Sequence, residues 1–393
     1  MKRVAVLGGG PAGSFAAERL ARAGLETVVF DEKLAWEKPC GGGLTYKAWH
    51  QYPFLMENDT PKKLITHTNI AAPRAGSASL QLRQPLLIYS RFDLNRMLLK
   101  RAENAGAQVE KARVLALDRQ DRGWLVRTGH GCVEADYCVI ATGARNPLRG
   151  VGTEWTPGDT ATALGYYVPG QQEHIDIQFL PGLDGYIWVF PRCGHLSVGI
   201  CGKNQPAQTM RARLERYMEE HSLSWRGATF YGHVLPSLSR HAWQRNRMAG
   251  DRWMAVGDAA GLVDPITGEG LYYAMRSGDL ASRTILDDAY APEAKAHAYR
   301  SLLREDFVAD LEFGSLLAGR VYSSRFLFST VPARMVQFTR HSPRFCALMQ
   351  DLFAGTQSYL GLKSRLVRGL RGTLGEALLG FFLNRLIPGE DIA

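Results

Sequence analysis

The 393-residue sequence has few cysteines and no long apolar run, and both shortages exclude classes of protein. Its six cysteines include no Cys-x-x-Cys pair and no histidine at zinc spacing, so we expect neither a disulfide scaffold nor a metal site. No uncharged apolar stretch reaches the ~18 residues that a membrane-spanning helix needs. Glycines and a proline interrupt the apolar N-terminus, which excludes a signal peptide. We therefore expect a reduced, cytoplasmic, globular chain.

Charge of one sign is in excess, and the excess lies mostly at the C-terminal end. Lys and Arg number 47 against 38 Asp and Glu, which gives a net charge of +9. The residues from Gly314 onward hold ten of the basic and four of the acidic side chains. Such a basic end suits an anionic partner, either a membrane surface or a nucleic acid, but a solvated basic face has the same composition.

The segment Lys363–Ile387 combines basic and apolar side chains in a way that suits a membrane surface. Its basic cluster is Lys363, Arg365, Arg368 and Arg371. Its apolar residues are Leu374, Leu378, Leu379, Phe381, Phe382 and Leu386. Both features are typical of a helix that lies on an anionic bilayer, although an amphipathic helix that packs inward has the same pattern.

Residues 1–32 have the pattern of one βαβ unit. Val4–Leu7 is a short apolar run typical of a buried parallel strand. The turn Gly8–Gly13 follows, and apolar residues then recur at helical spacing until a glycine ends the helix. A second strand, Thr27–Phe30, ends at Asp31. This order predicts a dinucleotide-binding unit.

Glycines at three positions of the turn match the dinucleotide fingerprint Gly-x-Gly-x-x-Gly. Gly8 permits the tight turn, Gly10 lets the backbone approach a pyrophosphate, and Gly13 lets the helix pack against the strand. The phosphates would meet the free N–H groups at the start of the helix. Asp31 would accept hydrogen bonds from a ribose, with Glu32 as the alternative because it points to the opposite face of the strand.

A second glycine-rich loop, far along the chain, indicates which dinucleotide binds. An apolar strand delivers Asp258 to the edge of the sheet, where its carboxylate would bind a ribityl hydroxyl. Gly268 and Gly270 then open a helix whose positive N-terminus would face the pyrimidine oxygen of a flavin. An enzyme that binds only NAD needs no such distant loop, whereas FAD extends across the domain. We therefore expect FAD.

Before and between these loops the chain holds further elements. The sequence predicts a helix over Arg91–Gly106 and strands over Val109–Leu117 and Tyr137–Ala141. From about residue 153 short β-like runs separated by glycine and proline predict a mostly antiparallel sheet inserted into the first domain. After residue 291 the pattern is helical.

The expected fold class is therefore α/β, with a Rossmann-like FAD-binding domain, an inserted, mostly antiparallel β-sheet substrate domain and a helical C-terminal region. The FAD-binding domain would have two parts, 1–152 and 248–290. The β-rich substrate-binding domain would span 153–247, and the helical C-terminal region 291–393.

Taken together, these motifs resemble the FAD-dependent hydroxylase-like superfamily and, within it, the geranylgeranyl reductase family. The loop Lys38–Leu44, with its Pro-Cys-Gly-Gly-Gly core, and the loop Asp264–Gly270 are similar to segments of that family. The strand Tyr186–Pro191 is similar to its substrate-cavity strand. The resemblance covers roughly residues 1–290. The chain departs from it at Ala141–Gly143, where superfamily hydroxylases usually have Asp-Gly, and this weakens the hydroxylase analogy.

The resemblance also implies roles for particular residues. Cys40 would lie beside the flavin ring, where its thiol, with a pKa lowered by Lys38, would protonate a substrate carbon or form a flavin adduct. The alternative is that Cys40 only reports the position of the loop as a small apolar residue. Arg91 matches the arginine that lies near FAD in the family. The expected cofactor-binding residues are Gly8, Gly10, Pro11, Ala12, Gly13, Asp31, Glu32, Cys40, Gly41, Gly42, Gly43, Arg91, Gly143, Asp258, Gly268, Gly270 and Leu271. The expected substrate-binding residues are Tyr186, Trp188, Phe190 and Pro191, although ordinary sheet packing also explains this aromatic strip.

By this resemblance the chain is an FAD-dependent reductase of carbon–carbon double bonds in an isoprenoid chain or isoprenoid lipid. An FAD-dependent monooxygenase or halogenase on the same scaffold is the alternative enzyme, and a non-catalytic, flavin-bound membrane-surface adaptor is the alternative of another class. The implied partners are a hydrophobic isoprenoid substrate and a membrane surface, at which a cytoplasmic protein would be peripheral, but no nucleic acid. NAD(P)H or another electron donor would reduce the flavin, and the sequence identifies neither that donor nor the proton donor.

Overall fold

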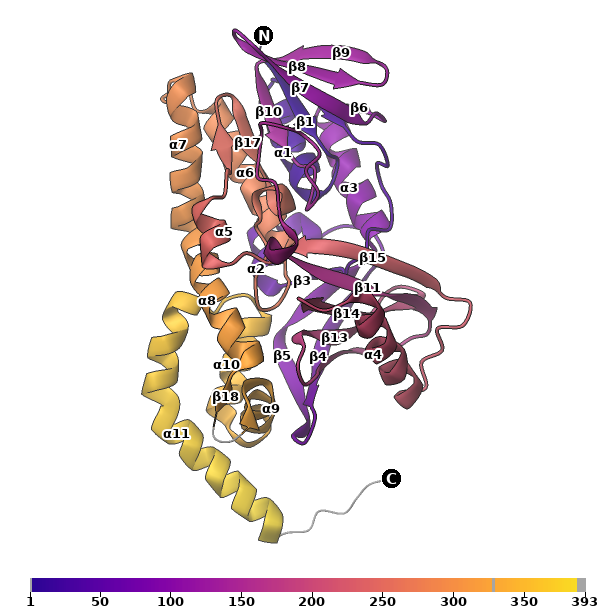
Figure 1. The fold of residues 1–393 in the computed structure, drawn as a ribbon, viewed down its shortest axis with the longest axis vertical. Coiled ribbons are helices and arrows are strands. Elements are labelled where there is room, and N and C mark those ends of the chain that lie inside the picture. Colours follow the sequence, from indigo (N-terminus) through magenta and orange to yellow (C-terminus); the bar gives the residue numbers. More distant parts are fainter. Residues whose placement is uncertain (1, 327–328, 387–393) are drawn as a thin grey trace.

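The computed structural model of the chain describes residues 2–326 and 329–386, and Figure 1 shows two main sheets, one above the other, with the C-terminal helices along one side. The upper sheet has six strands in the order β16-β17-β10-β1-β2-β6. Its strands are β1 Arg3–Leu7, β2 Glu26–Phe30, β6 Gln108–Glu110, β10 Tyr137–Ile140, β16 Ala249–Gly250 and β17 Trp253–Ala255. Neighbours pair in parallel, except β16 with β17. The expected Rossmann-like sheet is confirmed.

Three helices pack together beside this sheet. They are α1 Pro11–Arg22, α3 Arg91–Asn104 and α6 Leu271–Leu286. Helix α1 approaches α6 so closely that a Cβ on Gly278 would lie 2.5 Å from the Ala12 carbonyl oxygen. The glycine at 278 therefore permits the packing that joins the N-terminal unit to the segment after the second glycine-rich loop.

A separate three-stranded sheet follows β6. It consists of β7 Val114–Gln120, β8 Gly123–Thr128 and β9 Gly131–Ala135. The single strand expected over Val109–Leu117 is wrong, because β6 pairs with β2 in the six-stranded sheet whereas β7 pairs with β8. The backbone leaves strand conformation over 111–113 as it passes from one sheet to the other.

The lower sheet has eight strands in the order β15-β11-β14-β13-β12-β4-β5-β3. Its strands are β3 Gly43–Leu44, β4 Lys62–Ala72, β5 Gly76–Tyr89, β11 Thr160–Pro169, β12 His174–Phe179, β13 Asp184–Pro191, β14 His195–Lys203 and β15 Thr229–Pro236. Only β12 and β4 pair in parallel, so the expected mostly antiparallel sheet is confirmed. Three of its strands, β3 to β5, precede residue 152, so the segment 153–247 forms this sheet together with an earlier part of the chain.

The two faces of the lower sheet are covered by different helices. Helix α4, Ala207–Glu220, packs on one face over the apolar side chains of β11, β13 and β14. The C-terminal helices approach the other face, where α9 and α10 pack on β5. Alternate residues of β13 point to the two faces, so Ile187 lies in the core under α4 while Trp188 lies in the other core.

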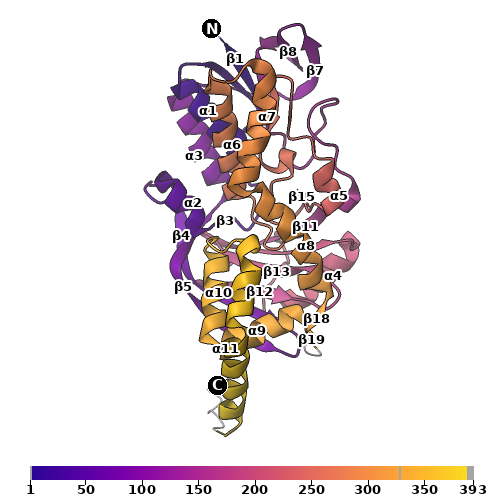
Figure 2. The same ribbon diagram turned by 90° about the vertical axis from the view of Figure 1, so that its left-hand side faces the viewer.

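Among the described residues after 291 the chain is mainly helical, as expected, with one short hairpin (Figure 2). Its helices are α7 Pro292–Leu303, α8 Ala309–Ser323, α9 Val331–His341, α10 Pro343–Phe353 and α11 Tyr359–Leu386, with a π-helical segment, Arg304–Val308, between α7 and α8. The hairpin is β18 Arg325–Phe326 with β19 Ser329–Thr330. The shorter elements elsewhere are α2 Tyr46–Gln51, α5 Arg240–Gln244 and the 3-10 turns Pro53–Leu55, Pro157–Asp159 and Gly257–Ala260.

Helix α11 carries the basic segment that the sequence analysis singles out. No helix within 2–326 and 329–386 is long and apolar enough to cross a bilayer. Lys363 and Arg368 are exposed, while Arg365 donates to a carboxylate oxygen of Asp351 over 2.7 Å. The side chains of Arg371, Leu374, Leu378, Leu379, Phe381, Phe382 and Leu386 lie outside those that the structure describes, as does the whole of Ile387.

Candidate functional site

One cavity of about 1180 Å³ lies between the two main sheets and reaches the C-terminal helices. It exceeds the ~300–1,000 Å³ typical of a small-molecule pocket, so it has room for a dinucleotide and a second ligand. The loops that follow β1, β2, β10 and β17 line one part of it, and β11 to β15 with α8 to α11 line another. Its wall contains these predicted residues: Gly10, Pro11, Ala12, Asp31, Cys40, Gly41, Gly42, Gly43, Arg91, Gly143, Tyr186, Trp188, Phe190, Asp258, Gly268, Gly270 and Leu271.

Four predicted residues lie outside this wall. Gly8 has a φ of +118°, and a Cβ there would lie 2.2 Å from the Ala141 carbonyl oxygen, so this glycine serves the turn and the strand packing. A Cβ on Gly13 would lie 1.9 Å from the Gly8 carbonyl oxygen. Glu32 is exposed and lies 3.8 Å from the Arg113 guanidinium. Pro191 is also outside the wall, and its side chain is buried.

The glycine turn presents an open backbone to the cavity. Gly10 is the N-cap of α1, and a Cβ built on it meets no atom within 4 Å. The empty space beside Gly10 and the free N–H groups at the start of α1 fit a pyrophosphate. The Gly9 N–H donates to Asp31 Oδ2 over 2.7 Å, which ties the turn to the end of β2. Asp31 accepts two further backbone N–H groups on Oδ1 and still lines the cavity, so its remaining lone pairs fit a ribose.

The second glycine-rich loop places a carboxylate on the same cavity. Lys38 Nζ donates to Asp258 Oδ2 over 3.0 Å, and both side chains are largely buried. Burial raises the pKa of the Asp258 carboxyl, but Lys38, His233 and Arg91 together bring it below its usual value. Asp258 Oδ1 lies 3.5 Å from where a Cβ of Gly270 would be, so the carboxylate stands at the positive end of α6. This polar cluster fits the ribityl and pyrimidine part of a flavin.

The Cys40 loop is held by a buried arginine. Arg192 is fully buried, forms an ion pair with Glu37 and donates to the carbonyl oxygen of Cys40. The Ser197 hydroxyl donates to the same carbonyl over 3.2 Å. The carboxylate of Glu37 also accepts the backbone N–H of Arg91 over 2.9 Å, which links this loop to the start of α3. We call Glu37, Arg192 and Ser197 the loop clamp.

Electrostatics around Cys40 favour its thiolate. Burial raises the pKa of the Cys40 thiol, but Arg91, the Gly42 N–H and Arg192 together bring the pKa below its usual value. The Gly42 N–H points at the sulfur, with N and Sγ 3.3 Å apart. Gly42 itself has a φ of +82°, and a Cβ there would lie 2.1 Å from the Tyr89 carbonyl oxygen, so only glycine fits at this position.

The aromatic strip of β13 lines the cavity, as the spacing predicts. Tyr186, Trp188 and Phe190 all contribute to the wall, and the Tyr186 hydroxyl donates to the Thr267 carbonyl of the second loop. The wall continues with apolar side chains from β12 and from the C-terminal helices. These are Ile177, Phe179, Met335, Phe338, Phe345, Leu348, Met349, Leu352 and Phe353. We call this part of the cavity the apolar lobe, and a long hydrocarbon chain suits it.

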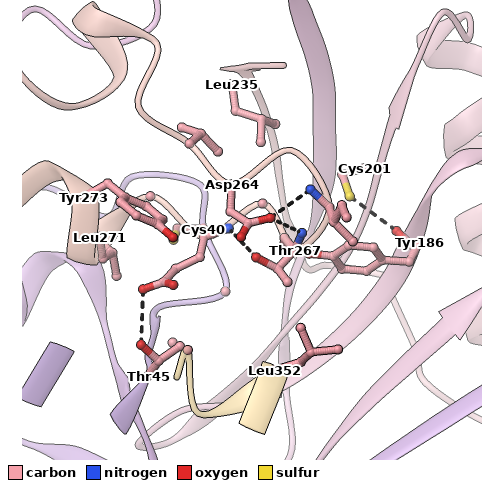
Figure 3. A pocket seen from close by; sticks show the side chains of 18 of the residues that line it. Cys40, Thr45, Tyr186, Cys201, Leu235, Asp264, Thr267, Leu271, Tyr273 and Leu352 are labelled. Carbon is pink, nitrogen blue, oxygen red and sulfur yellow. Dashed lines mark hydrogen bonds between the residues drawn. The ribbon is translucent and has the colours of Figure 1, made fainter. Parts of the chain in front are cut away.

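A network of hydrogen bonds fixes the loop Asp264–Gly270. Asp264 Oδ1 accepts the N–H groups of Ile266 and Thr267, each over 2.8 Å (dashed lines in Figure 3). The hydroxyl of Tyr359, at the start of α11, donates to both carboxylate oxygens over 2.8 and 2.9 Å. The Asp264 N–H donates to the Glu269 carbonyl over 2.8 Å and closes the loop. Asp264 is thus a structural carboxylate that holds the loop together. Glu269 lies near the end of the same loop and lines the cavity.

Sequence reasoning missed the loop clamp and the role of the C-terminal helices in the wall. Arg192 comes directly after the strand Tyr186–Pro191, and Glu37 directly before Lys38, so both stand next to motifs that the sequence analysis uses. A charged residue at the end of a buried strand was the available signal, because such a charge needs a buried partner. Nothing in the sequence indicates that the two segments meet.

Comparison with known proteins relates the chain to flavin-dependent oxidoreductases. A family model for pyridine nucleotide-disulphide oxidoreductases matches residues 2–165. The chloroplastic geranylgeranyl diphosphate reductase of Oryza sativa subsp. japonica is 30% identical over 324 residues, which are 72% of this chain and 66% of that protein. The menaquinone reductase of Mycobacterium tuberculosis (strain ATCC 25618 / H37Rv) is 29% identical over 365 residues, which are 84% of this chain and 87% of that protein. The chain thus spans about two thirds of the length of the plant relative.

The fold has a solved counterpart. A geranylgeranyl bacteriochlorophyll reductase-like protein from Thermoplasma acidophilum superposes with a TM-score of 0.76 at 22% identity, covering 94% of this chain and 99% of that one. At this identity the likeness shows the shared fold. The open backbone at Gly10 and the carboxylates of Asp31 and Asp258 on one cavity fit FAD, which is the cofactor that the family model and the relatives indicate.

Proposed function

We propose that this chain, an FAD-dependent oxidoreductase similar to the geranylgeranyl reductases, reduces carbon–carbon double bonds in an isoprenoid chain or isoprenoid lipid. The observation that carries the proposal is the continuity of one cavity from the glycine turn at Gly10 to the apolar lobe. A dinucleotide and a long apolar substrate would therefore share one enclosed space. Two relatives support this proposal, a geranylgeranyl diphosphate reductase and a menaquinone reductase, because geranylgeranyl diphosphate and menaquinone both carry prenyl chains.

Reduced FAD supplies hydride when it is bound, and the residues of this chain supply binding, orientation and exclusion of water. Gly10, Asp31 and Asp258 would hold the cofactor. The apolar lobe would hold the prenyl chain and keep water from it. The loop clamp would keep Cys40 and the glycines beside it in one position.

Reoxidation of the flavin by substrate tests this proposal. The purified protein is reduced anaerobically with dithionite, freed of excess reductant and mixed with geranylgeranyl diphosphate, which carries no other group that would oxidise the flavin. We expect the oxidised flavin spectrum to return with an unsaturated prenyl substrate and to stay absent with its fully saturated analogue. Equal reoxidation by both compounds, or by neither, would refute the proposed reaction.

Replacing Cys40 by serine should lower turnover several-fold without loss of FAD. Serine keeps the size and the loop geometry but removes a polarisable group whose anion Arg91 and Arg192 stabilise. The matched control is Cys201→Ser, because Cys201 also lines the cavity while burial raises the pKa of its thiol to about 11. Steady-state turnover and the bound-flavin spectrum of both variants show whether Cys40 contributes to turnover. If the two variants behave alike, Cys40 has no special role.

Binding to an anionic membrane is the second part of the proposal. Lys363 and Arg368 are exposed on α11, and each basic residue near an anionic surface contributes about 1 kcal/mol. We expect co-sedimentation with phosphatidylserine vesicles at low salt, its loss at high salt, and weaker binding of the variant Lys363→Gln/Arg368→Gln. Phosphatidylcholine vesicles are the control. Equal binding to both lipids, or to neither, would contradict this part of the proposal.

A further inference from the structure

Six carboxylates line the cavity, and five of them have strong partners. Asp31 accepts backbone N–H groups, Asp258 pairs with Lys38, and Asp264 accepts the Tyr359 hydroxyl and two N–H groups. Asp306 pairs with Arg276, and Asp310 accepts the N–H groups of Tyr359 and Leu360. The sixth is Glu269. These partners fix the first five carboxylates in place as structural groups.

Glu269 is held differently. Its Oε1 meets the Thr45 hydroxyl at 3.4 Å (Figure 3), and the Tyr272 N–H of α6 also contributes to its surroundings. Within the described part of the chain no Lys or Arg forms an ion pair with it. Lys47, whose charge lowers the pKa of Glu269, instead stands over the ring of Tyr272, with Nζ 4.4 Å from the ring centroid. A hydroxyl both donates and accepts, so Thr45 suits a protonated as well as an ionised Glu269.

The surroundings of Glu269 favour a proton on its carboxyl. Burial and the neighbouring carboxylate of Asp264 raise the pKa of Glu269 to about 7, against the smaller opposing effects of Lys47, the Thr45 hydroxyl and the Tyr272 N–H. The hydroxyls of Tyr272 and Tyr273, also on α6, face the same group of carboxylates and have raised pKa values. Near neutral pH a carboxyl of this kind both holds and releases a proton.

We propose that Glu269 is the general acid that protonates the substrate double bond. This assignment rests on the proposed function and adds the proton donor that the sequence does not identify. Cys40 is another ionisable group of the cavity wall, with a thiol pKa that the Gly42 N–H and the guanidinium groups of Arg91 and Arg192 lower, and the Cys40→Ser variant compares its contribution with that of Glu269. Thr45 is a positioning residue, since it acts on the substrate only through Glu269.

The step balances in atoms and electrons. The π bond of the alkene breaks, and its electron pair takes the Glu269 proton, forming one C–H bond and leaving a carboxylate. The second C–H bond takes the hydride of the reduced flavin, which is thereby oxidised. An external two-electron donor, such as a reduced nicotinamide nucleotide, restores the flavin, and a proton from solvent restores Glu269. An unactivated alkene is a poor hydride acceptor, so transfer of this proton is expected to accompany or precede hydride transfer.

The variant Glu269→Gln tests the assignment, because it keeps the shape of the side chain and cannot supply the proton. We expect turnover to fall at least ~100-fold, the usual contribution of a general acid, with FAD content unchanged. The wild-type rate should decrease as pH rises through about 7, because only the protonated carboxyl donates. This decrease of the rate with rising pH should be absent from the residual activity of Glu269→Gln and present in Cys40→Ser. In Glu269→Asp it should be partly restored.

A second readout does not depend on turnover. Infrared difference spectra of the FAD-loaded protein between pH 6 and pH 8.5 should contain a protonated-carboxyl band that Glu269→Gln lacks. Turnover of Glu269→Gln within about threefold of wild type, or no such band in the wild-type protein, would overturn the assignment. Failure of the wild-type protein to reduce any alkene would instead refute the proposed function, and the donor role with it. The two failures are therefore distinguishable.

Discussion

Replacing Gly10 by alanine is expected to weaken FAD binding at least ~100-fold, about 2.7 kcal/mol, while leaving the fold intact. The backbone at this position has a φ of −71°, which any residue adopts, and the new Cβ would meet no protein atom within 4 Å. The methyl group would instead take the space in which a pyrophosphate approaches the start of α1. Flavin content after purification and titration of the stripped protein with FAD measure the effect.

The control for this variant lies three residues away in the same turn. A Cβ on Gly13 would lie 1.9 Å from the Gly8 carbonyl oxygen, so Gly13→Ala must push α1 away from β1. We expect Gly13→Ala to lower the free energy of unfolding by about 1–3 kcal/mol, the cost of overpacking, and Gly10→Ala to leave it unchanged. Tight FAD binding by Gly10→Ala would mean that the cofactor does not approach the turn at this point.

Removal of the Arg192 side chain should have the largest effect on stability. Arg192→Met leaves the Glu37 carboxylate without its cation and the Cys40 carbonyl without one donor, in a place where the arginine is 0% exposed. Loss of one partner from a buried ion pair costs about 3 kcal/mol. The Glu37 carboxylate still accepts hydrogen bonds from the N–H groups of Arg91 and Phe92 in this variant. The decrease in the free energy of unfolding should therefore not greatly exceed this value. Urea unfolding of the flavin-free protein measures it.

The loss of stability caused by Arg192→Met should depend on pH, and the pKa of Glu37 gives the sign of that dependence. Burial raises the pKa of Glu37, but Arg192 and the N–H groups of Arg91 and Phe92 together bring it below its usual 4.5. A carboxyl whose pKa is lower in the folded state stabilises fully above its unfolded pKa, and this stability is lost as pH falls through the folded value. The difference between wild type and Arg192→Met should therefore shrink below pH 4.5.

Two further variants separate the clamp from ordinary ion pairing. Arg211→Met removes the Arg211–Glu215 pair, whose arginine side chain is 49% exposed, and should lower the free energy of unfolding much less than Arg192→Met does, because solvent screens the pair. The double variant Arg192→Met/Glu37→Gln removes both buried charges and should recover part of the loss. Equal costs for Arg192→Met and Arg211→Met would contradict the account of the clamp.

The sequence predicts the parts of this molecule that depend on local pattern. The βαβ unit, the antiparallel strands and the helical end follow from periodicity and glycine positions, and the aromatic strip follows from alternation along β13. The two glycine-rich loops line one cavity because the ends of parallel strands meet at one edge of a sheet. These features need no knowledge of distant contacts.

The parts that the sequence does not predict depend on contacts between distant segments. Strands β4 and β5 join the lower sheet through a parallel pairing of β4 with β12. Nothing in the composition of β4 and β5 indicates that β12 is the strand with which β4 pairs. Arg192 and Glu37 meet only because the Cys40 loop lies against the end of β13. Glu269 stands in a loop that the motif identifies, but its half-buried position beside Asp264 arises from the tertiary structure.

Mass analysis of the product of one anaerobic turnover tests the central claim most directly. The protein is purified with FAD, reduced with dithionite in the absence of oxygen and mixed with geranylgeranyl diphosphate, and the product is identified by mass spectrometry. The account predicts a product that has gained two hydrogen atoms for each double bond reduced, without any need for oxygen. A substrate that stays unchanged until oxygen is admitted, and then gains an oxygen or a halogen atom, would contradict it and identify a monooxygenase or halogenase.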